Sequence, residues 1–434
     1  MTAARAALSA SPARDRAPAA GASPRTIVIV NDHAAMTGGA AMVAIQSAIG
    51  FARRGLRVIF FAATGPIAPE LRDNSVETIC LGQPDITTAS SPLAFVGVAT
   101  WNGLARDKLS ELLDTLDPRD SVVHLHSWAK VLSPAIGRAF AGREIPVVAT
   151  LHDFFWVCPN GGFFVYPAGE TCHRVPQSLD CLRTNCDQRS HARKLWRSAR
   201  HWLLDHASGL KDVCRHAITL SATQERVARP WLPPAMRLHR VDNPIDIQDR
   251  GVADKTEPGP FLFVGRLAPE KGARLFCEAA RAIGARARIV GDGPLRDELQ
   301  RDFPEHDFAG WKSAAEVTHE MRAARALVFP SVLYEGQPLT VYEALANGCP
   351  VIASDAGAAV EAIEQDRNGF CFRSGDNASL ARAMTQLADD ARARSMARTA
   401  HEIYWRRPLT LDRHLDGVMA VYRAAMIAEA GIAV

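Results

Sequence analysis

Two cations and two carboxylates stand where they could bind a charged, hydroxyl-rich molecule. Arg266 and Lys271 lie in the run GRLAPEKG at 265–272, directly after an apolar stretch that is typical of a strand. Glu335 and Glu343 flank a proline that suits the first turn of a helix. Cations beside a helix N-terminus bind a diphosphate, and carboxylates accept hydrogen bonds from sugar hydroxyls. Together these residues predict a site for a sugar nucleotide.

Glycine-rich loops follow other predicted strands. Gly39 belongs to TGGA at 37–40, which opens a helical pattern, and Gly291 begins GDGP at 291–294. Glycine lets the backbone approach a ligand closely, although such loops are about as often ordinary turns. The loop at 37–40 is not a Walker motif, and it does not complete the dinucleotide-binding glycine triplet. The loops are therefore consistent with a nucleotide site and do not define one alone.

The elements that would position these loops alternate regularly. Short apolar runs at 26–30, 58–63, 121–126 and 147–151 are separated by helical patterns such as 40–54 and 104–116. The alternation restarts after Asn243-Pro244 with apolar runs at 261–264, 287–290, 326–329 and 350–353. Such alternation predicts parallel sheets covered by helices on both faces. We therefore expect an α/β protein with two doubly wound, Rossmann-like domains that face each other across a cleft.

The length and composition of the chain exclude several classes of protein. The chain has 434 residues, of which 47% are hydrophobic and 22% charged, with a net charge of +3. This balance argues against a dedicated nucleic-acid binder, and no apolar stretch is long enough to span a bilayer. The expected divisions are a disordered tail at 1–24, a first Rossmann-like domain at 25–243, a linker at 244–260, a second Rossmann-like domain with the predicted sugar-nucleotide site at 261–408 and a C-terminal helix at 409–434 that packs back across the domains. We expect a cytoplasmic protein that could lie at the inner face of the membrane.

The chain resembles the retaining glycosyltransferases of family 4, which have the GT-B fold. The resemblance extends over about 25–422 and is most specific in the second domain. The motifs that carry it are GRL..EKG at 265–272, GDGP at 291–294, FAGW at 308–311, the two glutamates Glu335 and Glu343 with seven residues between them, ALANGCPVIAS at 344–354 and, more loosely, TGG at 37–39, TLHD at 150–153 and NPID at 243–246.

The resemblance implies a role for each matching residue. Arg266 and Lys271 would bind the diphosphate, Glu343 the ribose hydroxyls and Glu335 the hydroxyls of the donor sugar. His152 would lie near that sugar, and Gly39 would approach the donor from the first domain. Trp311 would lie near the base, with a core position as the alternative. The expected catalytic residues are Glu335, His152, Arg266 and Lys271, and the expected donor-binding residues are Gly39, Arg266, Lys271, Gly291, Trp311, Glu335, Gly336, Gln337, Pro338, Leu339, Thr340 and Glu343.

The expected reaction is transfer of a sugar from a UDP- or GDP-sugar to a saccharide or a lipid-linked saccharide, in cell-surface polysaccharide or glycolipid synthesis. Retention of configuration is implied by the resemblance alone. No Asp-x-Asp pair lies at a suitable strand end, so we expect no essential Mg²⁺. The alternatives are a related hydrolase, phosphorylase or epimerase, and a metal-stapled binding protein without catalysis.

A cysteine-rich insertion and a basic helix lie outside this scheme. Cys158, Cys172, Cys181 and Cys186 fall within the insertion at 154–188, where prolines and glycines disfavour long elements. Four thiolates could hold one structural Zn²⁺, and free thiols, disulfides or an iron–sulfur cluster are the alternatives. The helix expected at 189–206 has an apolar face, expected to pack on the core, and a basic face that could contact an anionic membrane.

Overall fold

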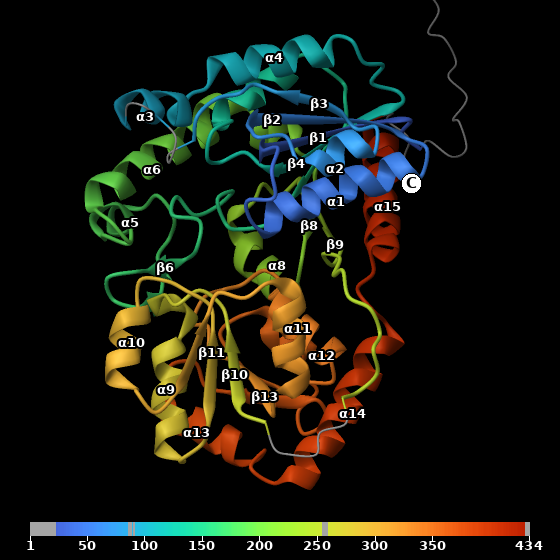
Figure 1. Ribbon diagram of the computed structural model, residues 1–434. Coiled ribbons are helices and arrows are strands. Elements are labelled where there is room, and N and C mark those ends of the chain that lie inside the picture. The colour runs from blue at the N-terminus through green and yellow to red at the C-terminus, as the bar shows by residue number, and fades with distance from the viewer. Residues whose placement is uncertain (1–22, 86–88, 90–91, 254–258, 430–434) are drawn as a thin grey trace, which may run out of the picture.

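The computed structural model describes residues 23–85, 89, 92–253 and 259–429. Most of the tail predicted at 1–24, part of the linker and the last residues of the predicted C-terminal helix lie outside this part of the chain. The described residues form two large sheets with their own helices, one in each half of the molecule (Figure 1). The prediction of an α/β protein with two Rossmann-like domains is confirmed.

The first domain contains a seven-stranded, entirely parallel sheet in the order β3-β2-β1-β4-β5-β8-β9. Strands β1 and β4 are buried along nearly their whole length and rich in Val and Ile, because helices cover both faces of the sheet. Two separate apolar clusters fill the two faces. The strands are β1 (Thr26–His33), β2 (Arg57–Thr64), β3 (Glu77–Cys80), β4 (Ser121–Ser127), β5 (Val147–Thr150), β8 (His216–Thr219) and β9 (Arg237–Arg240).

The second domain repeats this design with six parallel strands in the order β12-β11-β10-β13-β14-β15. Its two apolar clusters again lie on opposite faces of the sheet. The strands are β10 (Phe261–Val264), β11 (Ala287–Val290), β12 (Asp307–Gly310), β13 (Ala326–Phe329), β14 (Val351–Ser354) and β15 (Gly369–Phe372). A two-stranded antiparallel pair, β6 (Phe164–Val165) with β7 (Glu170–Thr171), lies in the cysteine-rich insertion.

The helices connect the parallel strands as crossovers. In the first domain they are α1 (Gly39–Arg53), α2 (Pro69–Asp73), α3 (Pro92–Thr100), α4 (Gly103–Leu113), α5 (Leu179–Arg183), α6 (His191–Leu203), α7 (Leu210–Val213) and α8 (Ala222–Ala228). In the second they are α9 (Ala273–Ala282), α10 (Arg296–Asp302), α11 (Ala314–Ala323), α12 (Leu339–Ala346), α13 (Asn377–Thr385) and α14 (Asp390–Arg406), followed by α15 (Leu411–Glu429).

The last helix returns to the first domain, where Figure 1 shows it in red beside α1. Leu415, Val418 and Tyr422 of α15 are buried in the apolar cluster on one face of the first sheet. The Tyr422 hydroxyl lies 2.7 Å from His124 Nδ1 of β4, so a polar contact accompanies this packing. Among the described helices, none is both long and apolar enough to cross a membrane.

Candidate functional site

Loops from both domains meet at the carboxyl ends of the two sheets. The side-chain amide of Gln224, in α8, donates to the backbone oxygen of Leu151 just after β5. A Cβ atom added to Gly336 of the second domain would lie 2.9 Å from that amide nitrogen. The backbone N–H of Asn243 donates to Gln337 Oε1 at 2.7 Å. The loop before α12 therefore packs directly against strand ends of the first domain, where ligands bind in such sheets.

The structure brings the predicted residues Lys271 and Glu335 together. Gly272 has φ +72°, and a Cβ atom there would come within 2.2 Å of the Pro330 oxygen, so the β10–α9 loop can lie on the β13–α12 loop only with glycine. As a result Lys271 Nζ lies 2.6 Å from Glu335 Oε1. The Ser331 hydroxyl donates to the same oxygen at 2.9 Å. Among the described residues no group donates to Glu335 Oε2, which is left as an acceptor for a ligand.

The second predicted cation, Arg266, is exposed and forms no ion pair with any described residue. Its loop is held by the neighbouring loop after β11. Gly291 has φ +134°, and a Cβ atom there would lie 1.9 Å from the Gly265 oxygen. The backbone N–H of Leu267 donates to the Asp292 oxygen at 2.9 Å. A fixed loop thus presents an unpaired guanidinium at the carboxyl edge of the sheet.

Helix α12 offers an anion-binding end and a second carboxylate. It begins after Pro338, and no side chain caps its N-terminus, so the first backbone N–H groups, those of Leu339 and Thr340 among them, are available to a ligand. Glu343 is half-buried in this helix, and burial raises the pKa of its carboxyl. None of the described residues forms a hydrogen bond with that carboxylate. An unpartnered, desolvated acceptor of this kind suits a pair of ribose hydroxyls.

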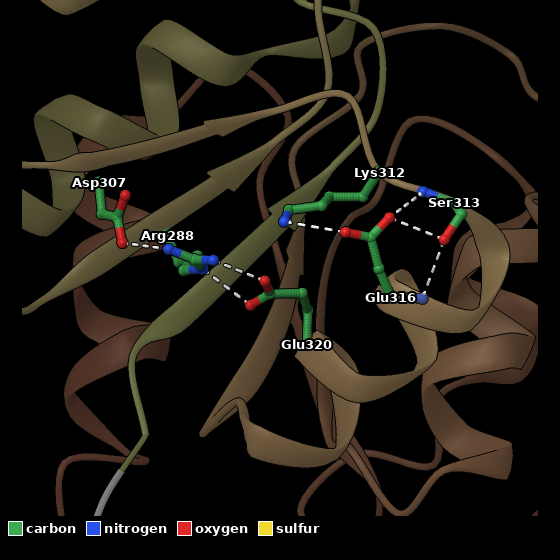
Figure 2. A network of polar contacts seen from close by, with 6 residues as sticks. All are labelled: Arg288, Asp307, Lys312, Ser313, Glu316 and Glu320. Carbon is green, nitrogen blue, oxygen red and sulfur yellow. Dashed lines mark hydrogen bonds and ion pairs between the residues drawn. The ribbon is translucent and has the colours of Figure 1, made fainter.

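Trp311 follows β12 and is 75% exposed, so the alternative of a core tryptophan is wrong. The chain is fixed directly after it by the capping box of α11. The Ser313 hydroxyl accepts a hydrogen bond from the Glu316 backbone, and Glu316 Oε2 accepts from the Ser313 backbone N–H at 2.8 Å (Figure 2). Lys312 Nζ lies 3.1 Å from the other carboxylate oxygen of Glu316. The indole of Trp311 is therefore exposed on a loop that is held at its C-terminal end by the capping box of α11.

Arg288 ties the same region to the sheet. Its guanidinium, on β11, donates to both carboxylate oxygens of Glu320 in α11 at 2.6 and 2.7 Å (Figure 2). It also pairs with Asp307 at the start of β12. One side chain thus joins both strands to the helix that follows Trp311.

In the first domain the structure pairs the predicted His152 with a residue that the sequence did not single out. His152 Nε2 lies 2.9 Å from Nδ1 of His126 near the end of β4. The two rings stack with centroids 5.1 Å apart. Burial lowers the pKa of His152 to about 3, so the imidazole is neutral at pH 7. The sequence signal that could have indicated this pair is the position of the two histidines, since both lie at the carboxyl ends of neighbouring strands.

Asp32 is a second residue that sequence reasoning missed. Its carboxylate, at the end of β1, accepts hydrogen bonds from the backbone N–H groups of Val131 and Leu132, both at 2.8 Å, and from the Ser127 hydroxyl. It fixes the loop after β4 beside the loop that leads to α1. Gly39 begins α1, and a Cβ atom there would meet no atom within 4 Å. The structure therefore shows open space on the side of Gly39 where a Cβ atom would lie.

The orientation predicted for the basic helix is wrong. In α6 the basic face is buried, with Lys194 and Arg200 at 0% and 6% exposure, whereas Leu195 and Trp202 are 44% and 56% exposed. The physical reason is that the cysteine-rich insertion supplies acceptors for the basic side chains: Lys194 Nζ donates to the Cys181 oxygen, and Arg197 pairs with Asp187 and Asn160. Lys194 and Arg200 are therefore buried in the first domain and are not presented on the surface of the helix.

The structure also gives no support to a zinc site in the insertion. Among the described residues, no group of three or more Cys, His, Asp or Glu side chains is placed to hold a metal ion. Cys158, Cys172, Cys181 and Cys186 are free thiols. Burial raises the pKa of the Cys158 thiol, although backbone N–H groups of residues 160–163 point at its sulfur. Hydrogen bonds and an ion pair between α6 and the insertion, among them the bond from Gln177 Nε2 to the Ser198 oxygen at 2.8 Å, hold this loop.

Comparisons with known protein families match both domains. Residues 37–249 match the family described as Glycosyltransferase Family 4, and residues 259–390 match Glycosyl transferases group 1. A glycogen synthase of Mycobacterium tuberculosis is 28% identical over 300 residues, which cover 65% of this chain and 64% of the relative. A GDP-mannose-dependent alpha-mannosyltransferase of the same species is 33% identical over 166 residues, 36% of this chain and 43% of the relative.

A third relative, the UDP-Gal:alpha-D-GlcNAc-diphosphoundecaprenol alpha-1,3-galactosyltransferase of Escherichia coli, is 28% identical over 33% of this chain and 40% of its own length. The matches therefore cover between 40% and 64% of the length of these three relatives.

Solved structures share the fold over nearly the whole chain. Anabaena HepE in complex with UDP superposes with a TM-score of 0.63 and 17% identity, covering 92% of this chain and 100% of that one. Sucrose-phosphate synthase of Thermosynechococcus elongatus gives a TM-score of 0.65 and 18% identity, covering 93% and 99%. With both domains matched by family models and both sheets in the expected arrangement, the chain belongs to the family 4, group 1 glycosyltransferases of GT-B fold.

Proposed function

We propose that the protein transfers a sugar from a nucleoside-diphosphate donor to a saccharide or lipid-linked saccharide, with retention, in polysaccharide or glycolipid synthesis. The observation that carries this proposal is the arrangement around Glu335. Lys271 contacts one of its oxygens, the other is unpaired, and Arg266 and the uncapped end of α12 supply positive potential from the same carboxyl edge of the sheet. Cations and backbone amides suit a diphosphate, and a carboxylate suits the hydroxyls of the attached sugar.

In this reaction the bond between the sugar's anomeric carbon and the diphosphate oxygen breaks, and the electron pair stays on that oxygen. The acceptor hydroxyl oxygen bonds to the same carbon, and its proton passes to the departing diphosphate, whose oxygen has kept the electron pair of the broken bond. Arg266, Lys271 and the first amides of α12 stabilise the charge that develops on the diphosphate, which is preorganised electrostatic catalysis. Glu335 orients the sugar through Oε2, and Glu343 holds the ribose.

The donor proposed is a UDP- or GDP-sugar, because relatives named for UDP-Gal and for GDP-mannose both match this chain. Trp311, 75% exposed on the loop after β12, is an aromatic side chain available to a base. Retention fits the family and is tested by the anomeric configuration of the product.

The test is a thermal-shift screen against UDP-, GDP-, ADP- and dTDP-sugars, since a ligand that binds the folded state raises its stability. The donor that gives the largest shift is then incubated with and without saccharide acceptors. Transfer that requires an acceptor supports the proposal. Release of free sugar or of a sugar isomer at the same rate without acceptor contradicts it and identifies a hydrolase or an epimerase.

A further inference from the structure

The histidine pair at the strand ends contains an unexplained nitrogen. His126 is 3% exposed, and its Nδ1 lies 2.9 Å from His152 Nε2. The other ring nitrogen, His126 Nε2, is fully buried and has no hydrogen-bond partner among the described residues. The neighbouring His124 does not fill this gap, because its two nitrogens bond to Tyr422 and Thr150.

Both members of the pair are neutral. Burial, reinforced by the neighbouring histidines, holds the pKa of His126 and of His152 well below the ordinary value of 6.5. Each ring therefore carries one N–H and one bare nitrogen at pH 7. Because the ring nitrogens face each other, one ring must donate to the other, and only two arrangements of the hydrogens satisfy the contact.

The unpartnered nitrogen decides between these arrangements. If His152 donated, the hydrogen of His126 would sit on Nε2, where it would be a buried N–H without an acceptor. Buried N–H groups are rarely left unpaired, and an unpaired bare nitrogen is the smaller loss. The hydrogen of His126 is therefore on Nδ1 and is donated to His152 Nε2. It follows that the hydrogen of His152 is on Nδ1.

His152 lies beside the loop before α12, where an N–H group could reach the proposed donor sugar. The next residue towards β5, Leu151, accepts the bond from Gln224, and the Gln224 amide lies against Gly336 of the loop before α12. His152 is only partly buried, unlike His126. The donor sugar proposed above, held by Glu335, would be close to this imidazole.

We propose that His126 is a positioning residue that fixes His152 as the neutral Nδ1–H tautomer, so that His152 donates a hydrogen bond to a hydroxyl oxygen of the donor sugar and does not act as a base. The inference about the tautomer rests on the structure of the free protein. The inference about the sugar also rests on the proposed function.

The tautomer is read directly from the nitrogen chemical shifts of ¹⁵N-histidine-labelled full-length protein, because a protonated ring nitrogen resonates far from a bare one. The chain has 14 histidines, so the signals of His152 are assigned by their absence in His152→Gln. We expect the proton on Nδ1 of His152. A proton on Nε2 would overturn the proposal, whether or not the protein transfers sugar.

Three variants of His126 separate positioning from structure. In His126→Asn the side-chain amide nitrogen replaces Nδ1 as a donor, so we expect the Nδ1–H tautomer and a turnover number close to that of the native protein. His126→Leu removes the donor, and we expect a mixture of tautomers and a loss of about tenfold in kcat, with little change in donor KM, the size of one lost hydrogen bond. His126→Asp supplies only an acceptor, and we expect the opposite tautomer and a larger loss.

The matched control is His216→Asn. His216 Nδ1 lies 3.0 Å from His239 Nε2, and these two rings also stack with centroids 5.1 Å apart, but they lie on β8 and β9, away from the residues of the donor site. We expect unchanged kcat in this variant. Equal losses in the Asn and Leu variants of His126, or full activity in the Leu variant with a changed tautomer, would contradict the positioning role. Melting curves of all variants identify any that fail to fold.

Discussion

Lys271 and Glu335 are 64 positions apart in the chain, and their charged groups lie 2.6 Å apart at the edge of the second sheet. The pairing explains how two carboxylates and two cations can share a site for an anionic ligand. Glu335 compensates the charge of Lys271 before the donor arrives, whereas Arg266 has no ion pair with any residue that the structure describes and is a free positive charge.

The first prediction concerns whether Glu335 contacts the donor sugar or the nucleotide. Glu335→Ala should lower kcat more than it weakens binding of the free nucleoside diphosphate, because Oε2 is assigned to the sugar and not to the nucleotide. Calorimetry with UDP and GDP and steady-state kinetics measure the two effects. Glu298→Gln removes an ion pair with Arg274 on α9 and serves as the control. A larger effect on nucleotide affinity than on kcat would contradict the assignment of Glu335 to the hydroxyls of the donor sugar.

The second prediction concerns Glu343. Glu343→Ala should weaken nucleotide binding by about 1.5–3 kcal/mol, the usual cost of losing hydrogen bonds to a charged group. Because burial raises the pKa of this carboxyl above its ordinary 4.5, native affinity should fall as pH decreases through that raised value, and Glu343→Gln should lack this dependence. Calorimetry between pH 5 and 8 checks both, with the exposed Glu402→Ala as control. Unchanged affinity in Glu343→Ala contradicts the assignment.

The sequence contained enough to predict the fold and the second-domain site, because apolar runs at strand spacing and loop motifs are local signals. In the two large sheets, strands β3, β8, β9, β12 and β15 were not predicted. Of these, β9 and β12 have the sequences RLHR and DFAG, which lack a continuous apolar run, and they are strands through pairing with β8 and β11.

The first domain was harder because its decisive contacts are between distant segments. The periodicity of α6 showed two faces correctly, but the buried face depends on acceptors that the insertion supplies, such as Asp187 beside Arg197. Likewise, His126 contacts His152 only because β4 and β5 are neighbours in the sheet.

The third prediction concerns the link between β11 and α11. Glu320 is 13% exposed on its side chain and takes two hydrogen bonds from Arg288, so Glu320→Ala should lower the free energy of unfolding by about 1.5–3 kcal/mol. Hydrogen exchange should also accelerate at residues 307–320, near Trp311. Glu305→Gln, in the exposed pair with Arg281, should change stability less. Equal effects of the two substitutions in urea unfolding would contradict this account.

The fourth prediction is a pH dependence of stability. His414 is buried between Ser47 and the Asp242 oxygen, and burial lowers its pKa from 6.5 to about 4. As pH falls below 6.5, the His414 imidazole binds a proton in the unfolded chain but stays neutral in the folded protein. The free energy of unfolding therefore falls by about 1.4 kcal/mol per pH unit down to about pH 4. His414→Gln should reduce this slope by one proton. An identical slope in native and variant protein, from urea unfolding at several pH values, would contradict the assignment.

The last prediction is that sugar transfer survives exhaustive treatment with EDTA. Metal-dependent enzymes that act on nucleotide sugars use the cation to neutralise the departing diphosphate, and here Arg266, Lys271 and the amides at the start of α12 are placed to supply that charge. Arg266→Gln should therefore lower kcat strongly while its melting temperature stays unchanged, because the exposed guanidinium has no ion pair with any described residue. Transfer is measured in a rapid assay before and after chelation. Loss of activity that Mg²⁺ or Mn²⁺ restores and Zn²⁺ does not would show that a divalent cation, and not these side chains, carries the charge.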